Sequence, residues 1–302
     1  MHILMIFLDG VGLGDNNPDV NPFVAGNLPT IRAMGNGSTW LKSSERQETD
    51  RAILIPTDPR LGVSGRPQSG TGQATIVTGR NIPKIIGQHY GPKPNQETRA
   101  LLDEDNFFKQ LAAKNKTSAI LEAYPPEWHA LINRGKRLPA SYQYAALSAG
   151  LTLSGEDELR AGTAISGDWT GEGWRTQLNY TDTPQITAFE AGKQLVILSR
   201  KYDFAFFPHW LTDIVGHRGP MERAVELLEA FDQALAGILS EWQDDEGLVV
   251  VTSDHGNIEE IGNRKHTEND VPTLVIGGRR HEFAKNITDL SDLVPAIQRL
   301  LF

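Results

Sequence analysis

The sequence predicts an α/β protein in which a mostly parallel sheet carries helices on both faces. Short apolar runs with the length of buried strands recur along the chain, at 3–8, 118–123, 204–207, 248–252 and 273–276. Helical patterns lie between several of these runs. Strands that alternate with helices in this way are typical of a largely parallel sheet covered on both sides.

Two segments have clear helical patterns. Residues 221–242 place apolar side chains three and four positions apart, at Ala224, Leu227, Leu228, Phe231, Leu235 and Ile238. Residues 289–301 begin with Asp289, a suitable N-cap residue, and predict a final helix. In sheets of this kind the functional residues gather on loops at the carboxyl ends of strands. We therefore expect the functional residues of this chain on those loops.

The chain is long enough for one large domain with a substantial insertion. It has 302 residues, and its middle part is rich in aromatic residues, glycine and proline. We expect residues 1–90 and 195–302 to form the core. Residues 91–194 are expected to form a small inserted cap over the site.

Composition limits the classes of function. The formal net charge of −9 disfavours a nucleic-acid partner, because phosphate backbones are bound by clustered lysine and arginine. A small phosphorylated substrate remains compatible, since metal ions can supply local positive charge. The chain has no cysteine, which excludes disulfides, thiolate zinc sites and cysteine nucleophiles.

The expected location is the cytoplasm. The apolar start, residues 1–8, is too short for a signal peptide, and no segment approaches the roughly 20 apolar residues that span a bilayer. No membrane partner is therefore expected. The sequence leaves the oligomeric state open.

Metal-capable side chains occur in four separate segments, each at a strand end or in a loop. The candidates are Asp9, Ser69, Asp213, His217, Asp254, His255 and His266. Three carboxylates, three histidines and one candidate nucleophile fit a site for two divalent ions. With only oxygen and nitrogen donors, Mn²⁺ and Zn²⁺ are both suitable.

These segments resemble the metalloenzyme core shared by cofactor-independent phosphoglycerate mutase, phosphopentomutase and alkaline phosphatase. The match to the phosphoglycerate mutase version is closest, and it covers roughly residues 1–90 and 195–302. The matching motifs are Ser69 with Gly72 and Gly79-Arg80, Asp213-Ile214-Val215-Gly216-His217, Asp254-His255-Gly256-Asn257, and His266-Thr267 followed by Val271-Pro272.

The resemblance implies an alkaline-phosphatase-like fold, a metal assignment and a nucleophile. One ion is assigned to Asp9, Ser69, Asp254 and His255, and the other to Asp213, His217 and His266. Contact with a divalent cation favours the alkoxide of Ser69, which then forms a phosphoserine. Thr71 is the alternative nucleophile, because some relatives use threonine.

The implied activity is that of a phosphatase or phosphomutase acting on a small phosphorylated metabolite, and we expect water to be the usual acceptor. The alternatives are a phosphodiesterase or sulfatase on the same scaffold, and a metal-binding interaction protein without catalysis. Phosphoglycerate mutases of this type are much longer, so their substrate residues cannot be carried across. On charge alone, the candidate anion contacts are Arg80, Lys84, His89, Arg134, Lys136, Arg137 and Arg175.

Overall fold

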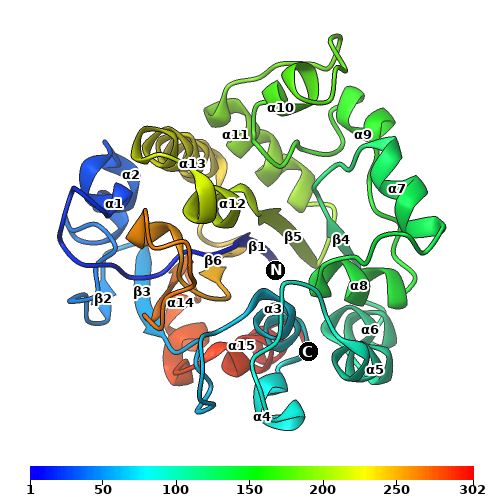
Figure 1. Cartoon of the computed structure of the whole chain (residues 1–302), viewed down its shortest axis with the longest axis horizontal. Coiled ribbons are helices and arrows are strands. Elements are labelled where there is room, and N and C mark those ends of the chain that lie inside the picture. The colour runs from blue at the N-terminus through cyan, green and yellow to red at the C-terminus, as the bar shows by residue number, and fades with distance from the viewer.

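The computed structural model describes residues 1–302 and is built around one seven-stranded sheet (Figure 1). The strand order is β2-β3-β7-β6-β1-β5-β4, and β6, β1, β5 and β4 are parallel to one another. The antiparallel pairs are β6 with β7, β7 with β3, and β3 with β2. The strands are β1 His2–Leu8, β2 Gln47–Glu48, β3 Ala52–Thr57, β4 Ser118–Ile120, β5 Phe204–His209, β6 Gly247–Ser253 and β7 Val271–Ile276.

The predicted α/β class is confirmed, and all five predicted strands form. Strands β2 and β3 were not predicted. Helix α13, Met221–Glu241, occupies the segment with the clearest helical pattern. At the end of the chain, the Asp289 side chain accepts a hydrogen bond from Ser291 N at 2.8 Å, which caps the turn η3, Leu290–Asp292, ahead of α15, Leu293–Leu301.

The remaining helices are short. They are α1 Pro22–Ala25, α2 Pro29–Met34, α3 Ser69–Thr78, α4 Ile82–Ile86, α5 Gln96–Glu104, α6 Phe107–Ala113, α7 Pro126–Asn133, α8 Ser141–Ser148, α9 Glu156–Arg160, α10 Glu172–Thr176, α11 Ala188–Ser199, α12 Leu211–Arg218, η1 Ile258–Glu260, α14 Arg280–Phe283 and η2 Ala284–Asn286. None of the helices combines the length and the apolar character that crossing a membrane requires.

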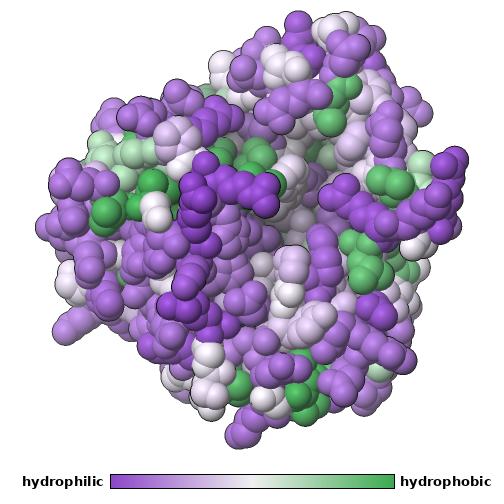
Figure 2. Space-filling view, in the orientation of Figure 1, coloured by the Kyte–Doolittle hydropathy of each residue, from purple (hydrophilic) through white to green (hydrophobic).

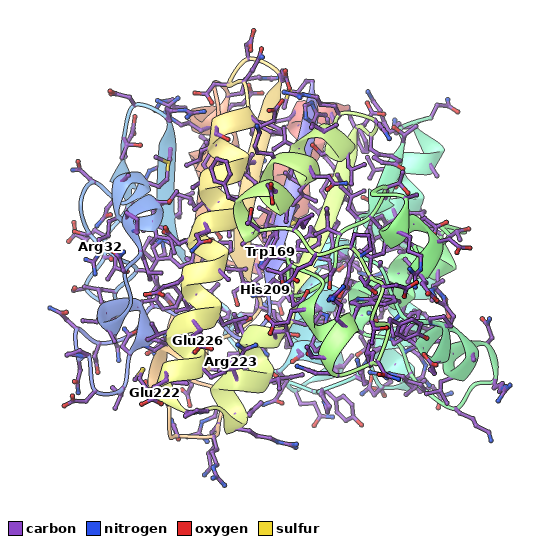
Figure 3. All side chains as sticks on the ribbon, turned by 90° about the horizontal axis from the view of Figure 1, so that it is seen from above. Arg32, Trp169, His209, Glu222, Arg223 and Glu226 are labelled. Atoms are coloured by element: carbon purple, nitrogen blue, oxygen red, sulfur yellow. The ribbon has the colours of Figure 1, made fainter.

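Helices cover both faces of the sheet, as predicted. Side chains of β1 alternate between two large hydrophobic clusters: Ile3, Met5 and Phe7 join one, and Leu4, Ile6 and Leu8 join the other. The first cluster lies under α3, α5, α6, α8 and α15, and the second under α1, α2, α11 and α13. Figure 3 shows Trp169 and His209 close together inside the second layer, with their ring centroids 5.4 Å apart.

The register of the central strands determines where the candidate site lies. Leu8, the last residue of β1, lies opposite His209 of β5 and Ser253 of β6. The carboxyl ends of these three central strands are therefore level. Residues that follow them, such as Asp9 and Asp254, emerge at one edge of the sheet.

The middle segment, residues 91–194, packs closely against the rest of the chain. It contributes β4 to the edge of the sheet, where Ile120 pairs with Phe206 of β5. Its helices α5, α6 and α8 enter the first hydrophobic cluster, while a small separate cluster lies around α9 and α10. The division into a core and a cap remains a proposal.

The contact between α11 and α13 requires glycine. A Cβ atom on Gly192 would lie 2.0 Å from the carbonyl oxygen of Ala234. The reciprocal position is equally close, because a Cβ on Gly237 would lie 2.0 Å from the carbonyl oxygen of Phe189. The two helices therefore meet backbone to backbone.

We expect Gly192→Ala to force these helices apart and to lower the free energy of unfolding by about 1–3 kcal/mol, as overpacking does elsewhere. Urea denaturation followed by circular dichroism measures the change. Lys193→Ala, on the next residue of α11, is the matched control. Equal stability of the two variants would show that the helix contact is looser than described.

Candidate metal centre

The seven predicted metal-site residues come together at the carboxyl ends of the central strands. Asp9 follows β1, and Asp254 and His255 follow β6. Asp213 and His217 lie one turn apart on α12, which begins just after β5. His266 returns to the site on a loop that is bridged to the β6 loop through Gly256 and Thr267.

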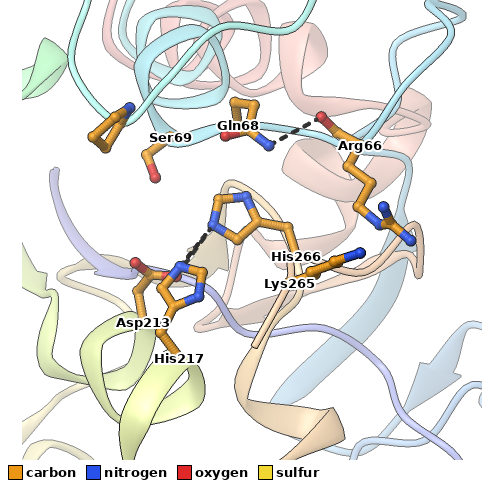
Figure 4. Close-up of a pocket in the computed structure, with 8 residues that line it drawn as sticks. Arg66, Gln68, Ser69, Asp213, His217, Lys265 and His266 are labelled. Atoms are coloured by element: carbon orange, nitrogen blue, oxygen red, sulfur yellow. Dashed lines mark hydrogen bonds and ion pairs between the residues drawn. The ribbon is translucent and has the colours of Figure 1, made fainter. Parts of the chain in front are cut away.

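One group of converging ligands contains Asp213, His217 and His266 (Figure 4). Asp213 Oδ1 lies 3.4 Å from His217 Nε2 and 3.5 Å from His266 Nε2. The two Nε2 atoms are 3.1 Å apart. Two imidazoles and one carboxylate that face a common point are a suitable donor set for a divalent ion.

The second group is centred on His255. Its Nε2 atom lies 3.4 Å from Asp9 Oδ1, 3.6 Å from Asp254 Oδ2 and 2.9 Å from Ser69 Oγ. Asp9, Asp213 and His255 also converge, so Asp213 lies between the two groups. The close placement of all these donors supports a paired site.

Backbone carbonyl groups orient the three histidines. His266 Nδ1 lies 2.8 Å from Pro67 O, His217 Nδ1 lies 3.1 Å from Arg264 O, and His255 Nδ1 lies 3.3 Å from Gly256 O. When Nδ1–H donates to a carbonyl oxygen, the lone pair is left on Nε2. In this tautomer each Nε2 points its lone pair into the site, as a metal ligand requires.

Burial strongly affects the charges of the second group. Burial, together with the neighbouring carboxyls, raises the pKa of Asp9 well above its usual range and the pKa of Asp254 to about 7. Burial also lowers the pKa of His255 to about 3, which keeps its imidazole neutral. Burial opposes ionisation of Asp213 too, but the hydrogen bond with His266 and the nearby histidines hold its pKa well below the usual value.

Among the metal-site residues, two buried carboxyl oxygens have no hydrogen-bond partner. They are Asp9 Oδ1 and Asp254 Oδ2, and both face His255. Buried polar atoms are normally satisfied, so unpartnered oxygens beside an inward-facing imidazole fit a bound cation. The residues present therefore fit divalent metal ions.

Ser69 and Thr71 differ in what their hydroxyl groups contact. Ser69 is the first residue of α3, and its hydroxyl faces His255. Thr71 donates to Gln68 O at 3.2 Å and accepts from Tyr90 N at 3.2 Å. The hydroxyl of Thr71 thus joins two backbone segments, while that of Ser69 is directed at the metal ligands.

A cavity of about 480 Å³ opens above the metal ligands. Arg66 and Lys265, which were not among the predicted residues, line it together with Ser69 (Figure 4). Neither side chain forms a salt bridge, so both are available to an anion. The sequence could have indicated both residues, because Arg66 stands close to Ser69 and Lys265 directly precedes His266.

The anion contacts predicted on charge alone do not line this cavity. Arg80 pairs with Glu104 at 3.3 Å beyond the far end of α3, and His89 Nε2 lies 3.1 Å from Arg60 O. Arg175 donates to Thr183 O at 2.9 Å. The others are exposed, Lys84 on α4 and Arg134, Lys136 and Arg137 after α7.

A buried carboxylate, Glu259, joins the loops that carry the ligands. It accepts hydrogen bonds from Gly12 N at 2.9 Å, Asn257 N at 2.7 Å and Asn269 Nδ2 at 3.0 Å, and also from the Thr267 hydroxyl. These donors belong to the loops of Asp9, Asp254 and His266. Glu259 was not among the predicted residues, although it stands two residues after the Asp-His-Gly-Asn motif.

Comparison with known proteins gives matches of two kinds. Residues 177–301 match the family described as the Metalloenzyme superfamily. A 2,3-bisphosphoglycerate-independent phosphoglycerate mutase of Methylobacillus flagellatus is 30% identical over 131 residues, which are 40% of this chain and 25% of the mutase. The chain thus matches about a quarter of the length of such mutases.

Solved structures are similar over the whole chain. A protein of Pyrococcus horikoshii aligns with a TM-score of 0.61 and 16% identity, over 99% of this chain and 96% of that one. Alkaline phosphatase from the Antarctic bacterium TAB5 aligns with a TM-score of 0.53 and 11% identity, over 99% and 98%. These matches confirm the predicted α/β fold.

We expect Glu259→Gln to weaken metal binding by about 10–100-fold, the usual effect of losing a group that orients metal ligands. The amide cannot accept at both positions that the carboxylate serves. Calorimetric titration of the metal-stripped protein with Mn²⁺ measures the change, and thermal melting checks the fold. Glu260→Gln, on the adjacent half-buried residue, is the control; equal Mn²⁺ affinity of both variants would exclude this role.

Proposed function

We propose that this relative of the alkaline phosphatases is a metal-dependent phosphatase that acts through a phosphoserine at Ser69. The observation that carries the proposal is the position of the Ser69 hydroxyl, 2.9 Å from His255 Nε2 and beside two unpartnered carboxyl oxygens. A serine in this place is both a candidate metal ligand and a candidate nucleophile.

Several features favour the binding of a phosphate group in the cavity. Ser69 begins α3, and the first turn of a helix presents N–H groups and a positive dipole end to an anion. Arg66 and Lys265 add two cations at the rim. In a chain with a net charge of −9, this local positive charge marks the part of the surface where an anion would bind.

The residues assigned to the two ions are the same seven that the sequence predicted. Asp213 lies between the two sets of ligands. One set comprises Asp9, Ser69, Asp254 and His255, and the other Asp213, His217 and His266. When bound, Mn²⁺ or Zn²⁺ supplies positive charge that favours the serine alkoxide and offsets charge on phosphoryl oxygens.

The proposed reaction has two steps. Ser69 Oγ attacks the phosphorus, the bond from phosphorus to the ester oxygen breaks, and the alcohol leaves with the proton that the serine gives up. Water then attacks the phosphoserine, which releases inorganic phosphate and restores the Ser69 hydroxyl. Water is the favoured acceptor because the cavity is rimmed by exposed side chains and opens to solvent.

Ser69→Ala is expected to reduce turnover of 4-nitrophenyl phosphate by roughly 10³-fold or more, because the nucleophile is lost. Mass spectrometry of acid-quenched wild-type protein should place the phosphate on the peptide that contains Ser69. Released inorganic phosphate should carry one ¹⁸O atom when the reaction is run in labelled water.

Thr71→Val is the matched control. It removes two hydrogen bonds and so lowers stability, but phosphorylation of the Ser69 peptide should persist. Phosphate on Thr71 would overturn the assignment of the nucleophile. Isomerised sugar phosphate without labelled inorganic phosphate would identify a mutase instead.

A further inference from the structure

A second set of polar side chains lies next to the metal centre, at the carboxyl ends of β4 and β5. Glu122 and Tyr124 follow β4, and Trp210 follows β5. Lys93, in the loop before α5, is close enough for its charge to act on Glu122. Figure 2 shows the surface hollowed here, above β5 and between α12 and α7 as they appear in Figure 1.

Two of these side chains are buried without full hydrogen bonding. Glu122 is 2% exposed, and its Oε1 accepts from Trp210 Nε1 while Oε2 has no partner. The hydroxyl of Tyr124, which is 4% exposed, also lacks a partner in hydrogen-bond geometry, and it lies close to Glu122. An unsatisfied buried polar group is costly, so two neighbouring ones favour a ligand that completes them.

Lys93 connects this set to the nucleophile. Its loop packs on the start of α3, since a Cβ on Gly70 would lie 2.8 Å from Lys93 O. The half-buried ammonium group forms no salt bridge, yet it is close enough to Asp9 and Glu122 to offset part of the rise that burial causes in the pKa of each carboxyl. The set is therefore continuous with the metal centre.

We propose that Lys93, Glu122 and Tyr124 bind the alcohol portion of the phosphate ester, and that this portion carries several hydroxyl groups, as in a sugar or polyol phosphate. The proposal rests on the phosphatase function proposed above. It adds the chemical class of the leaving group.

Hydroxyl groups suit this subsite better than an ammonium group. Lys93 lies within it and Arg137 is nearby, so a cation would be repelled. Burial raises the pKa of Glu122 to about 8, so near neutral pH its carboxyl can both donate and accept, as a hydroxyl partner requires.

Aromatic faces complete the subsite. The rings of Tyr124 and Trp128 stack with their centroids 4.4 Å apart, and Trp210 is half-buried beside Glu122. Flat apolar surfaces with a polar edge are amphipathic, like a sugar ring, which has C–H faces and a hydroxyl rim. This combination favours a polyhydroxylated ring over a purely apolar group.

The test measures binding to the metal-loaded Ser69→Ala protein, which cannot form the phosphoserine. Calorimetry compares glucose 6-phosphate with cyclohexylmethyl phosphate, a ligand with a six-membered ring and no hydroxyl groups. We expect tighter binding of glucose 6-phosphate. Tyr124→Phe should reduce this preference by about fivefold, the effect of one uncharged hydrogen bond.

Two further changes keep the test decisive. Tyr144→Phe removes a hydroxyl that bonds to Asp103 outside the subsite, and the preference should stay the same. Glu122→Leu should abolish the preference and Glu122→Gln should restore most of it, because the amide supplies both a donor and an acceptor. Tyr124→Phe is the variant safest for folding, since it removes a hydroxyl without a partner.

Three results would overturn the proposal: no preference for glucose 6-phosphate, an equal effect of Tyr124→Phe and Tyr144→Phe, or tighter binding of phosphoethanolamine than of both ring phosphates. Turnover of 4-nitrophenyl phosphate by the wild-type protein is measured separately. If turnover is absent but the preference holds, the phosphatase function fails and the hydroxyl-binding subsite stands. Turnover without the preference would remove the subsite alone.

Discussion

The burial of Asp9 and Asp254 at the ends of adjacent parallel strands is the constraint on which the site depends. Both carboxyl groups are almost inaccessible to water, and each keeps an oxygen without a hydrogen-bond partner. An isolated ionised carboxylate in such surroundings is very costly, whereas a carboxylate bound to a divalent cation is not. The converging histidines supply nitrogen donors. A metal ion bound there would find suitable ligands and would balance the charge of the carboxylates.

The backbone around these carboxylates is fixed by close packing. A Cβ on Gly72 would lie 3.0 Å from the Cβ of Asp254, and one on Gly256 would lie 2.1 Å from the Thr267 hydroxyl. Glycine at these positions lets α3 and the His266 loop approach the loop after β6. Glu259 then joins three ligand loops through one carboxylate. The ligand geometry is therefore a property of the loops together, and no single motif determines it.

The sequence allowed the fold class to be predicted. It also indicated the seven side chains that the structure brings together, because most of them lie next to an apolar run that forms a strand. It did not reveal β3, whose apolar pattern is interrupted by Pro56, or the place of Lys93 and Glu122, which depends on how the middle segment packs. Arg80 shows why charge alone misleads: the ordinary turns of α3 carry it away from Ser69 to a salt bridge with Glu104. Contacts between residues far apart in the chain cannot be read from local patterns.

We propose that the strand ends hold two metal ions around Ser69. Anomalous diffraction from crystals of the Mn²⁺-loaded protein tests it most directly. We expect two peaks, one in contact with Asp213, His217 and His266, and the other in contact with Asp9, Asp254 and His255. A single peak, or manganese bound only elsewhere on the surface, would contradict it.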